Sequence, residues 1–289
     1  MPGARTAALR VPGQFERVPG GVAVHGTGES LWRAVLQSRV AEFARVCLGD
    51  PFHAADTKTF NACLQRLPWE SCLWHGIGEA GSAILTKEHV PALRIEVSSV
   101  RSRLYHTGFI EECVRAAVAS RSSALVVDEQ PAPALDDVHP PPLVHIQLRH
   151  DACQVTVSAT GPLHQRGYHR PSKELPVRET LAAASVLESP LLRRLAVAAH
   201  SNEELVVWDP FCSSGVLLLE ALGIALGQLP RAEGKCYPFM RFPCHAQGDY
   251  AQFLHNIDIT PHPALPRLRL LGTDTSQLHI ERAGRNLER

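Results

Sequence analysis

The stretch from Leu205 to Leu226 constrains the fold more than any other part of the sequence. Residues 205–208 read LVVW, which is typical of a short buried strand, and DPFCSSG (209–215) follows as a turn of mostly small residues. The apolar residues 216–226 then predict a helix. A strand, a tight turn and a helix in this order open a doubly wound α/β domain, in which ligands bind at the carboxyl ends of parallel strands.

A second strand is predicted at Leu268–Gly272, and an acid, Asp274, follows it. A turn of small residues lets the backbone approach a ligand, and an acid in this place can accept hydrogen bonds from ribose hydroxyls. Asp274 lies much farther from the turn than the about 20 positions of the dinucleotide fingerprint, so an irregular insertion at 228–266 is expected between the strands. Two alternatives remain open at this point: a unit that binds nothing, and a nucleotide-dependent oxidoreductase, which the absence of GxGxxG disfavours.

The residues before the turn predict a separate region of mixed helices and strands. A helix is expected from Glu29 or Ser30 to Cys47, with Gly49-Asp50-Pro51 ending it. Residues 128–142 hold five prolines among acids and are expected to form a loop or linker. The other expected elements are strands at 22–25, 92–100, 143–148 and 153–159, the last two as a hairpin, and helices at 57–67, 107–119, 177–187 and 277–288.

Composition limits the partners and the compartment. Lys+Arg and Asp+Glu both number 29, so any nucleic-acid surface must be a local patch. The eight cysteines have no CxxC spacing, and Cys236, Cys244 and His245 lack a fourth ligand, so we expect no metal and a reducing compartment. No apolar stretch reaches the roughly 18 residues of a membrane span, so we expect no membrane partner. A cytoplasmic location is the expectation, with mitochondrial and nucleolar locations as alternatives.

Three sequence blocks carry a specific resemblance. DPFCSSGVLLLEAL (209–222) resembles the motif that binds S-adenosyl-L-methionine (SAM) in THUMP-domain class I RNA methyltransferases. HQRGYHRPSKELPVRETLAAASVL (164–187) is similar to the segment that leads into their catalytic domain. GTDTSQLHIERAGRNLER (272–289) is similar to their second motif. The three blocks occur in the order found in that family.

Within this family, the chain most resembles the large-subunit rRNA N2-guanine methyltransferases. The resemblance adds GGVAVHGTGESLWRAVLQSRVAEFARV (20–46), VSSVRSRLYHTGFIEECVRAAV (97–118) and YPFMRFPCHAQGDYAQFL (237–254), and it runs from about residue 15 to the end. It implies an α/β protein in which a ferredoxin-like and THUMP α+β region precedes the first part of a Rossmann-like methyltransferase domain. The implied divisions are a disordered start (1–18), a ferredoxin-like segment (19–55), a THUMP RNA-binding domain (56–162) and an incomplete Rossmann-like domain (163–289).

The resemblance also implies a cofactor, SAM, and residues that hold it. Asp209, Phe211, Cys212, Ser213 and Gly215 would surround its methionine end, and Asp274 would take its ribose hydroxyls. Simple packing is the alternative for Phe211 and Cys212, while Glu220 is interpreted as a polar-face residue and Asn286 as structural. Ser213 stands where the family has glycine. If this position needs a positive φ, a side chain there costs about 1–2 kcal/mol, and its Cβ would crowd the cofactor.

Two basic-aromatic clusters are the candidate RNA contacts, since cations suit phosphates and rings stack on bases. rRNA is the expected partner and tRNA the alternative. For each single residue, a solvated loop is the bland alternative. The clusters comprise Arg101, Arg103, Tyr105 and His106 before the THUMP helix, and Arg166, Tyr168, His169, Arg170 and Lys173 before the catalytic domain.

The catalytic motif of the family, Asn/Asp-Pro-Pro-Tyr/Phe, does not occur in the sequence, so no catalytic residue is assigned. The sequence ends after two predicted strands, and a two-stranded sheet with apolar edges is marginal alone. We therefore expect a fragment or a partner chain that completes the sheet. Two functions follow: a SAM-dependent rRNA (guanine-N2-)methyltransferase, or a catalytically inactive RNA-binding or ribosome-assembly module derived from one.

Overall fold

The computed structural model describes residues 11–73, 93–121, 142–167, 177–231 and 236–287, and it divides into two compact units. The first unit comprises Met1–Glu42, Pro162–Lys235 and Gly248–Arg289, and the second comprises Phe43–Gly161 and Cys236–Gln247. The boundary at 161/162 lies one residue before the one expected at 162/163, whereas the boundary expected at 55/56 lies instead at 42/43. Residues 43–55 and 236–247 belong with the sheet of the second unit.

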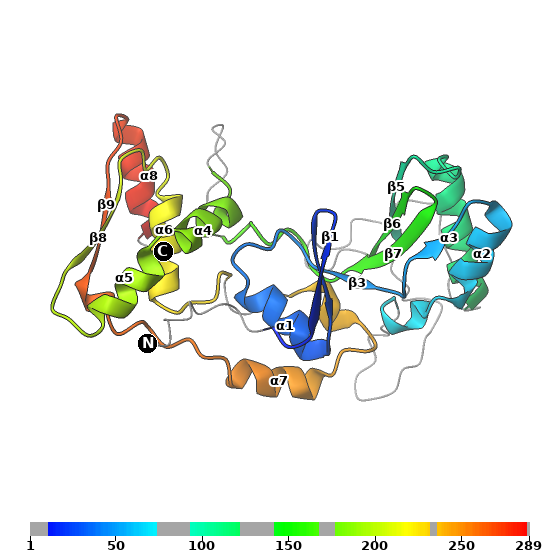
Figure 1. The fold of residues 1–289 in the computed structure, drawn as a ribbon, viewed down its shortest axis with the longest axis horizontal. Coiled ribbons are helices and arrows are strands. Elements are labelled where there is room, and N and C mark those ends of the chain that lie inside the picture. The colour runs from blue at the N-terminus through cyan, green and yellow to red at the C-terminus, as the bar shows by residue number, and fades with distance from the viewer. Residues whose placement is uncertain (1–10, 74–92, 122–141, 168–176, 232–235, 288–289) are drawn as a thin grey trace. The chain divides into compact units, whose positions relative to one another are not determined.

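The second unit is a five-stranded sheet with two helices packed together beside it (Figure 1). β5 (Arg94–Val100) runs parallel to β6 (Leu143–Arg149), and β6 pairs antiparallel with β7 (Ala152–Ser158). The hairpin predicted here is confirmed, and its turn residues His150 and Asp151 have φ of 51° and 60°, as in a type I′ turn. The remaining elements are β3 (Arg45–Cys47), β4 (Phe52–His53), α2 (Thr57–Arg66) and α3 (Thr107–Arg121).

The core of this unit lies between the sheet and these helices. Alternate residues of β7 are buried, as the period of a half-buried strand predicts. The buried face of α3 follows helical spacing, so the two periods meet in one core. The members from residues 43–161 with at most 1% of their surface exposed are Ala54, Phe60, Leu64, Trp69, Ile110, Val114, Val118, Val144, Ile146, Leu148, Cys153, Val157 and Ala159.

The first unit contains the strand-turn-helix predicted from the sequence. β8 (Leu205–Asp209) is parallel to β9 (Leu268–Gly272), and α6 (Val216–Ala225) follows β8. One face of the two strands packs on α5 (Leu191–Ala198) and α6, and the opposite face leaves Val206, Trp208 and Leu271 about half exposed. The α/β class is confirmed. The unit also contains α4 (Glu179–Glu188) and α8 (Gln277–Leu287).

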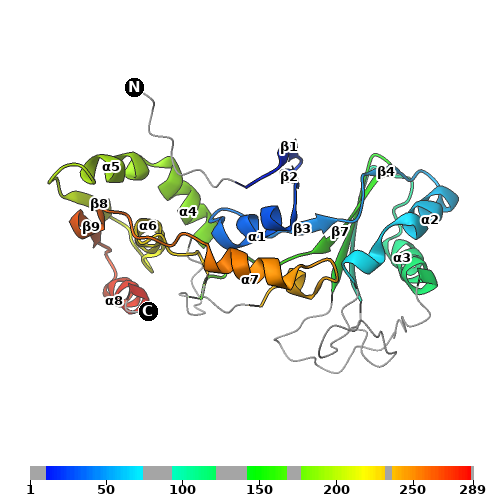
Figure 2. The same cartoon turned by 90° about the horizontal axis from the view of Figure 1, so that it is seen from below.

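The start of the chain adds a hairpin and a helix to the first unit. β1 (Gln14–Val18) pairs with β2 (Gly21–His25), so residues 14–18 form a strand where a disordered start was expected. α1 (Gly28–Gln37) lies alongside α7 (Gln247–His255), as Figure 2 shows. The ring of Trp32 contacts those of Tyr250 and Phe253 at centroid distances of 5.3 and 5.6 Å. α7 was missed from the sequence because the whole stretch 228–266 was predicted to be irregular.

The prediction of one helix reaching Cys47 is wrong beyond Gln37. Ser38 takes extended backbone angles, and its Oγ accepts a hydrogen bond from the N–H of Ala41 at 3.1 Å. Residues 45–47 pair with β7 instead of continuing the helix. The apolar residues Val40 and Phe43 remain exposed, so their helical spacing had no core to face.

Candidate functional site

The two loops that carry the predicted motifs meet at one edge of the β8–β9 sheet. The parallel register pairs Asp209 with Gly272, so both strands end at the same level. Two backbone hydrogen bonds of 2.9 Å then join the loops, from Cys212 N–H to Thr273 O and from Thr273 N–H to Asp209 O. The site therefore lies at the carboxyl ends of parallel strands, where doubly wound folds bind their ligands.

Asp274 fastens the turn to α8. Its Oδ2 accepts the N–H of Ser213 at 3.0 Å, and its Oδ1 accepts the N–H of Ser276 at 2.9 Å and contacts Nδ1 of His279 at 3.0 Å. These contacts, with the hydrogen bond from Ser276 foremost, lower the pKa of Asp274 below its usual value. The carboxylate lies at the predicted ligand edge, but three of its acceptor positions are engaged within the chain. Its binding to ribose stays a prediction.

The turn is built from left-handed backbone. Ser213 has φ of 48° and Gly215 has φ of 79°. The condition left open for position 213 is therefore met, and Ser213 carries the cost of about 1–2 kcal/mol for a side chain on left-handed backbone. A Cβ on Gly215 would lie 3.2 Å from the Cβ of Ala283 on α8, so this glycine also permits close packing.

Ser214 is a candidate ligand contact that the sequence did not single out. Ser214 is 8% exposed, and its Oγ has no hydrogen-bond partner among the described residues. A buried hydroxyl without a partner is costly unless a ligand or water satisfies it. Its carbonyl, in contrast, accepts a buried hydrogen bond from Nδ2 of Asn286 at 2.9 Å, which agrees with the structural role expected for Asn286. The signal in the sequence was its place directly before the glycine that opens α6.

Three other turn residues differ in what they present. Phe211 is 78% exposed, so the packing alternative is wrong for this residue. Cys212 is 4% exposed and packs in a cluster with Leu218 and Ala283, and burial raises the pKa of its thiol. The packing alternative therefore holds for the side chain of Cys212, and only its backbone lines the turn. Asp209 is buried, and its Oδ1 accepts the N–H of Phe211 at 3.1 Å.

Two further features of the turn bear on ligand binding: close packing at Gly272 and polar groups at the start of α6. The edge has no room for a larger residue at Gly272, where a Cβ would lie 2.9 Å from Cδ1 of Leu218 and 3.0 Å from the thiol of Cys212. The unpartnered hydroxyl of Ser214 and the N–H groups at the start of α6 provide polar contacts for a ligand with charged groups.

The first RNA cluster is exposed on the second unit. Arg101, Arg103, Tyr105 and His106 lie between β5 and α3, and all four side chains are exposed. The rings of Tyr105 and His106 are 4.2 Å apart, while Nε of Arg103 lies 3.6 Å from the carboxylate of Asp151. The segment thus offers rings and cations together, and its contact with RNA stays a prediction.

Arg166, from the second RNA cluster, needs a correction. Its side chain is 1% exposed and lies 2.5 Å from the carboxylate of Glu220, so it has no exposed guanidinium for an RNA phosphate. A buried charge requires a partner, and Glu220 supplies it. The other members of this cluster, Tyr168, His169, Arg170 and Lys173, lie outside the described residues.

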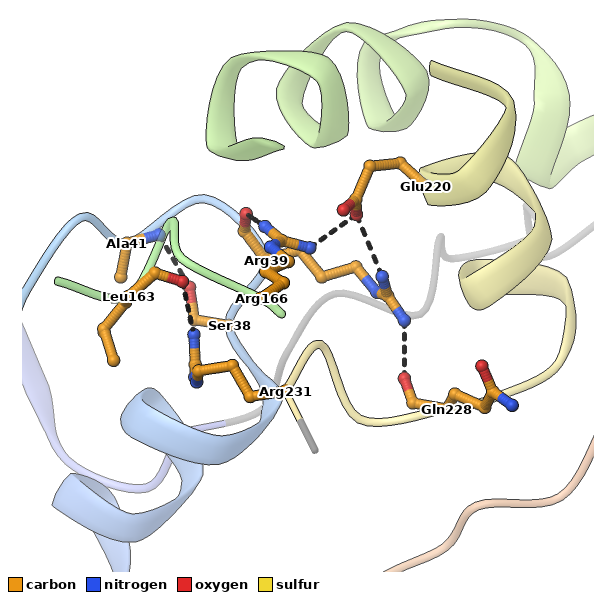
Figure 3. A network of polar contacts seen from close by, with 8 residues as sticks. All are labelled: Ser38, Arg39, Ala41, Leu163, Arg166, Glu220, Gln228 and Arg231. Atoms are coloured by element: carbon orange, nitrogen blue, oxygen red, sulfur yellow. Dashed lines mark hydrogen bonds and ion pairs between the residues drawn. The ribbon is translucent and has the colours of Figure 1, made fainter. Parts of the chain in front are cut away.

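Glu220 also needs a correction, because it is not a polar-face residue. Its side chain is 1% exposed and joins two arginines, as Figure 3 shows. Nη1 of Arg39 lies 2.9 Å from the same carboxylate oxygen that Arg166 contacts. Arg39 also donates to the carbonyl of Gln228 at 2.5 Å, and Arg166 donates to the carbonyl of Arg39. We call Arg39, Arg166 and Glu220 the arginine–glutamate cluster.

The described part of the chain offers no candidate membrane-spanning helix and no candidate metal-binding group. No helix there is both long and apolar enough to cross a membrane. Within the same residues, no group of three or more His, Cys, Asp or Glu side chains could hold a metal ion. The eight cysteines carry free thiols.

Comparison with curated proteins finds relatives over most of the chain, although no protein-family model matches it. A ribosomal RNA large subunit methyltransferase K/L from Allochromatium vinosum is 27% identical over 92% of this chain and 34% of its own length. A protein of the same name from Psychromonas ingrahamii is 25% identical over 95% of this chain and 33% of its own length. The chain thus spans about a third of the length of these relatives. The resemblance seen in the sequence is confirmed.

Comparison with solved structures finds proteins that share the mixed α/β fold of this chain. A protein from Listeria monocytogenes, described as a predicted N6-adenine-specific DNA methylase, matches with a TM-score of 0.71 at 22% identity, over 95% of this chain and 64% of that one. SMU.472, a protein solved in complex with SAH (S-adenosylhomocysteine), matches with a TM-score of 0.67 at 22% identity, over 95% of this chain and 65% of that one. These likenesses concern the mixed α/β fold.

Proposed function

We propose that this chain is the SAM-binding and RNA-contacting part of an RNA methyltransferase. The observation that carries the proposal is the meeting of the left-handed turn 210–215 with Asp274 at the carboxyl ends of β8 and β9, beside the unpartnered hydroxyl of Ser214. The relatives named as large-subunit rRNA methyltransferases support RNA as the substrate, and rRNA ahead of tRNA. Methylation at N2 of guanine is the finer proposal, and it rests on the sequence resemblance.

In this proposal the residues of the chain bind and orient the cofactor. The turn and the start of α6 hold the methionine end of the cofactor, Asp274 accepts hydrogen bonds from its ribose, and Phe211 shields the site from water. When bound, SAM supplies a methyl group on a sulfonium, which an amine attacks in an SN2 displacement. Such a reaction gains mainly from positioning the two reactants in line. The sequence contains no Asn/Asp-Pro-Pro-Tyr/Phe, so no residue of this chain is assigned to the target amine.

Contact with RNA is assigned to Arg101, Arg103, Tyr105 and His106. The two arginines would pair with phosphates, and the Tyr105 and His106 rings would stack on an unpaired base. Because net charge is zero, this local patch must provide the attraction for a polyanion.

A second candidate function is a binding module that has lost catalysis. Ser213, in place of the family's glycine, favours it. Both candidates share the need to cover the face of β8 and β9 that exposes Val206, Trp208 and Leu271, since parallel sheets are generally buried on both faces. We propose that a further polypeptide segment packs against this face and covers it.

Calorimetry with SAH tests the cofactor proposal. We expect the chain to bind SAH with a dissociation constant below about 1 mM, which corresponds to about 4 kcal/mol of binding free energy. Asp274→Asn should weaken binding, whereas Glu204→Gln, at the opposite end of β8, should leave it unchanged. No binding of SAH by the folded chain would refute the cofactor proposal and leave the binding module.

A gel shift with rRNA fragments tests the RNA proposal. Replacing Arg101, Arg103 and His106 by alanine should weaken binding by at least about tenfold, because two phosphate contacts and a stacked ring are lost. Lys58→Ala with Arg66→Ala, which removes two exposed cations from α2 of the same unit, is the charge-matched control. Equal affinities of the two variants would contradict the assignment.

A further inference from the structure

α6 has no side that faces water. Its sequence, VLLLEALGIA, has one charged residue, Glu220, and none of its residues is exposed. Apolar residues lie on every side of this helix, so apolar burial selects one rotation about its axis less sharply than it does for an amphipathic helix. The position of Glu220 does distinguish one rotation from another, since a buried carboxylate is tolerated only where cations meet it.

The cations that meet Glu220 come from segments far from α6 in the sequence. Arg39 follows α1, and Arg166 follows β7, and both reach the same carboxylate oxygen, Oε2. Arg39 lies directly over α6, because a Cβ on Gly223 would be 3.1 Å from both of its terminal nitrogens. Gly223, one helical turn after Glu220, thus leaves the space that the Arg39 guanidinium occupies.

The turn of the candidate cofactor site leads directly into α6. Gly215 is the N-cap of α6, and Ser214 precedes it. Glu220 lies six residues after Ser214, or about 9 Å along the helix axis. A rotation or shift of α6 would therefore move the hydroxyl of Ser214 and the N–H groups at the helix start.

We infer that Arg39, Arg166 and Glu220 are positioning residues that fix the rotation of α6 and thereby aim the cofactor turn. The inference rests on the proposed function, because it concerns the same site. Buried ion pairs can be replaced by apolar side chains with little loss of stability, and what they then provide is a unique arrangement. The arginine–glutamate cluster accordingly matters more for cofactor affinity than for the stability of the fold.

Two variants of the full chain separate these two effects. Glu220→Gln leaves two arginines without their shared anion, and the triple variant Arg39→Met, Arg166→Met, Glu220→Leu replaces the whole cluster by apolar side chains. SAH affinity is measured by calorimetry, and stability by the urea midpoint. We expect Glu220→Gln to lower both, with affinity falling at least about tenfold. The triple variant should regain the urea midpoint but not the affinity.

Gly223→Ala tests the Arg39 arm without removing any charge. Its Cβ would lie 3.1 Å from both terminal nitrogens of Arg39, so the guanidinium must shift by a few tenths of an ångström relative to Glu220. Alanine favours the helix, so affinity should fall and the urea midpoint should not. Gly284→Ala is the matched control, because a Cβ there meets nothing within 4 Å. Phe253→Leu is the control for a general loss of stability, because it disturbs the contact with Trp32 in the same unit and changes no residue of α6.

Amide hydrogen exchange at Ser213 gives a readout that needs no ligand. The N–H of Ser213 is bonded to Asp274, so a rotated α6 should speed its exchange in Glu220→Gln and in the triple variant, but not in Phe253→Leu. If the wild type binds no SAH but this exchange pattern holds, the proposed function fails and the positioning role stands. If the triple variant regains affinity together with stability, or if exchange at Ser213 is unchanged, the cluster is only structural and the inference is overturned.

Discussion

Ser213→Gly isolates the cost of placing a side chain on left-handed backbone in the cofactor turn. Ser213 has φ of 48°, and its N–H, which every variant keeps, holds the turn to Asp274. Removing the Cβ relieves about 1–2 kcal/mol of strain in the folded state. Glycine also gives the unfolded chain more conformations, which offsets about 0.4–1 kcal/mol of that gain. The net expectation is a rise of about 0.8 kcal/mol in the free energy of unfolding.

Cofactor affinity answers a different question from stability. The strain at Ser213 is present with and without ligand, so it cancels in the binding free energy. Only contact between its Cβ and the cofactor can change the dissociation constant. If that Cβ crowds the site, Ser213→Gly should bind SAH more tightly by up to about tenfold, which equals about 1.4 kcal/mol.

Urea unfolding and calorimetry measure the two effects on the same samples. Ser213→Ala is the control, since it keeps the Cβ and the left-handed cost and removes only the hydroxyl. It should match the wild type within about 0.5 kcal/mol in stability. The strain argument would be refuted if Ser213→Gly lowered the free energy of unfolding by about 1 kcal/mol or more while Ser213→Ala left it unchanged. This threshold is about twice the ordinary scatter of surface substitutions.

Three further substitutions test the rest of the turn. Gly215→Ala should lower the free energy of unfolding by at least about 1–2 kcal/mol, because φ is 79° and the new Cβ would meet Ala283 at 3.2 Å; an unchanged urea midpoint would contradict this. Asn286→Ala should cost about 1–3 kcal/mol, since it leaves the buried carbonyl of Ser214 without its donor, and a loss below about 0.5 kcal/mol would show that water replaces the amide. Because the pKa of Asp274 is lowered in the folded state, its ionised carboxylate stabilises the fold. This stabilisation is complete at pH values above about 3.9, the pKa of the unfolded carboxyl, and it is lost as pH falls through the lower folded pKa. Acid should therefore destabilise the wild type more than Asp274→Asn below about pH 4, and parallel pH profiles in urea would argue against the hydrogen bonds to Ser213 and Ser276.

The local sequence pattern was sufficient to predict the strands and the turn that form the candidate site. The apolar run at 205–208, the small-residue turn and the strand at 268–272 all form as predicted, because each follows a period or a turn chemistry that needs no distant partner. Whether Ser213 has a positive φ was left open by the sequence, and the structure gives its value, 48°. Pairing between β8 and β9 was implied by the order of the motifs.

The errors arise where a distant segment decides the outcome. The apolar spacing of residues 38–47 indicates a helix, but β7 offers this segment a strand to pair with. α7 lies in a proline-rich stretch and forms where Tyr250 and Phe253 find the ring of Trp32. Neither partner is visible from the neighbouring sequence, so local periodicity was outweighed by tertiary contacts.

The assignment of Arg166 failed for a reason that the sequence did contain. A basic residue beside Tyr168 and Arg170 suggests an RNA surface when it is considered alone. An apolar helix with one acid, such as α6, predicts that some cation must lie close to that acid, because an unpaired buried carboxylate is too costly. Searching for the partner of Glu220 would have directed attention to arginines outside the motif.

The cofactor turn is consequently held by residues on both sides of its own motif. Asp274 and Asn286, which follow β9, bind the backbone of Ser213 and Ser214. Glu220 is held by Arg39 and Arg166 from segments that precede the turn. A strand-turn-helix unit alone would present the same small residues without these contacts, and its turn would be free to take other conformations. Affinity for a cofactor should therefore depend on the blocks that precede and follow the motif as much as on the motif itself.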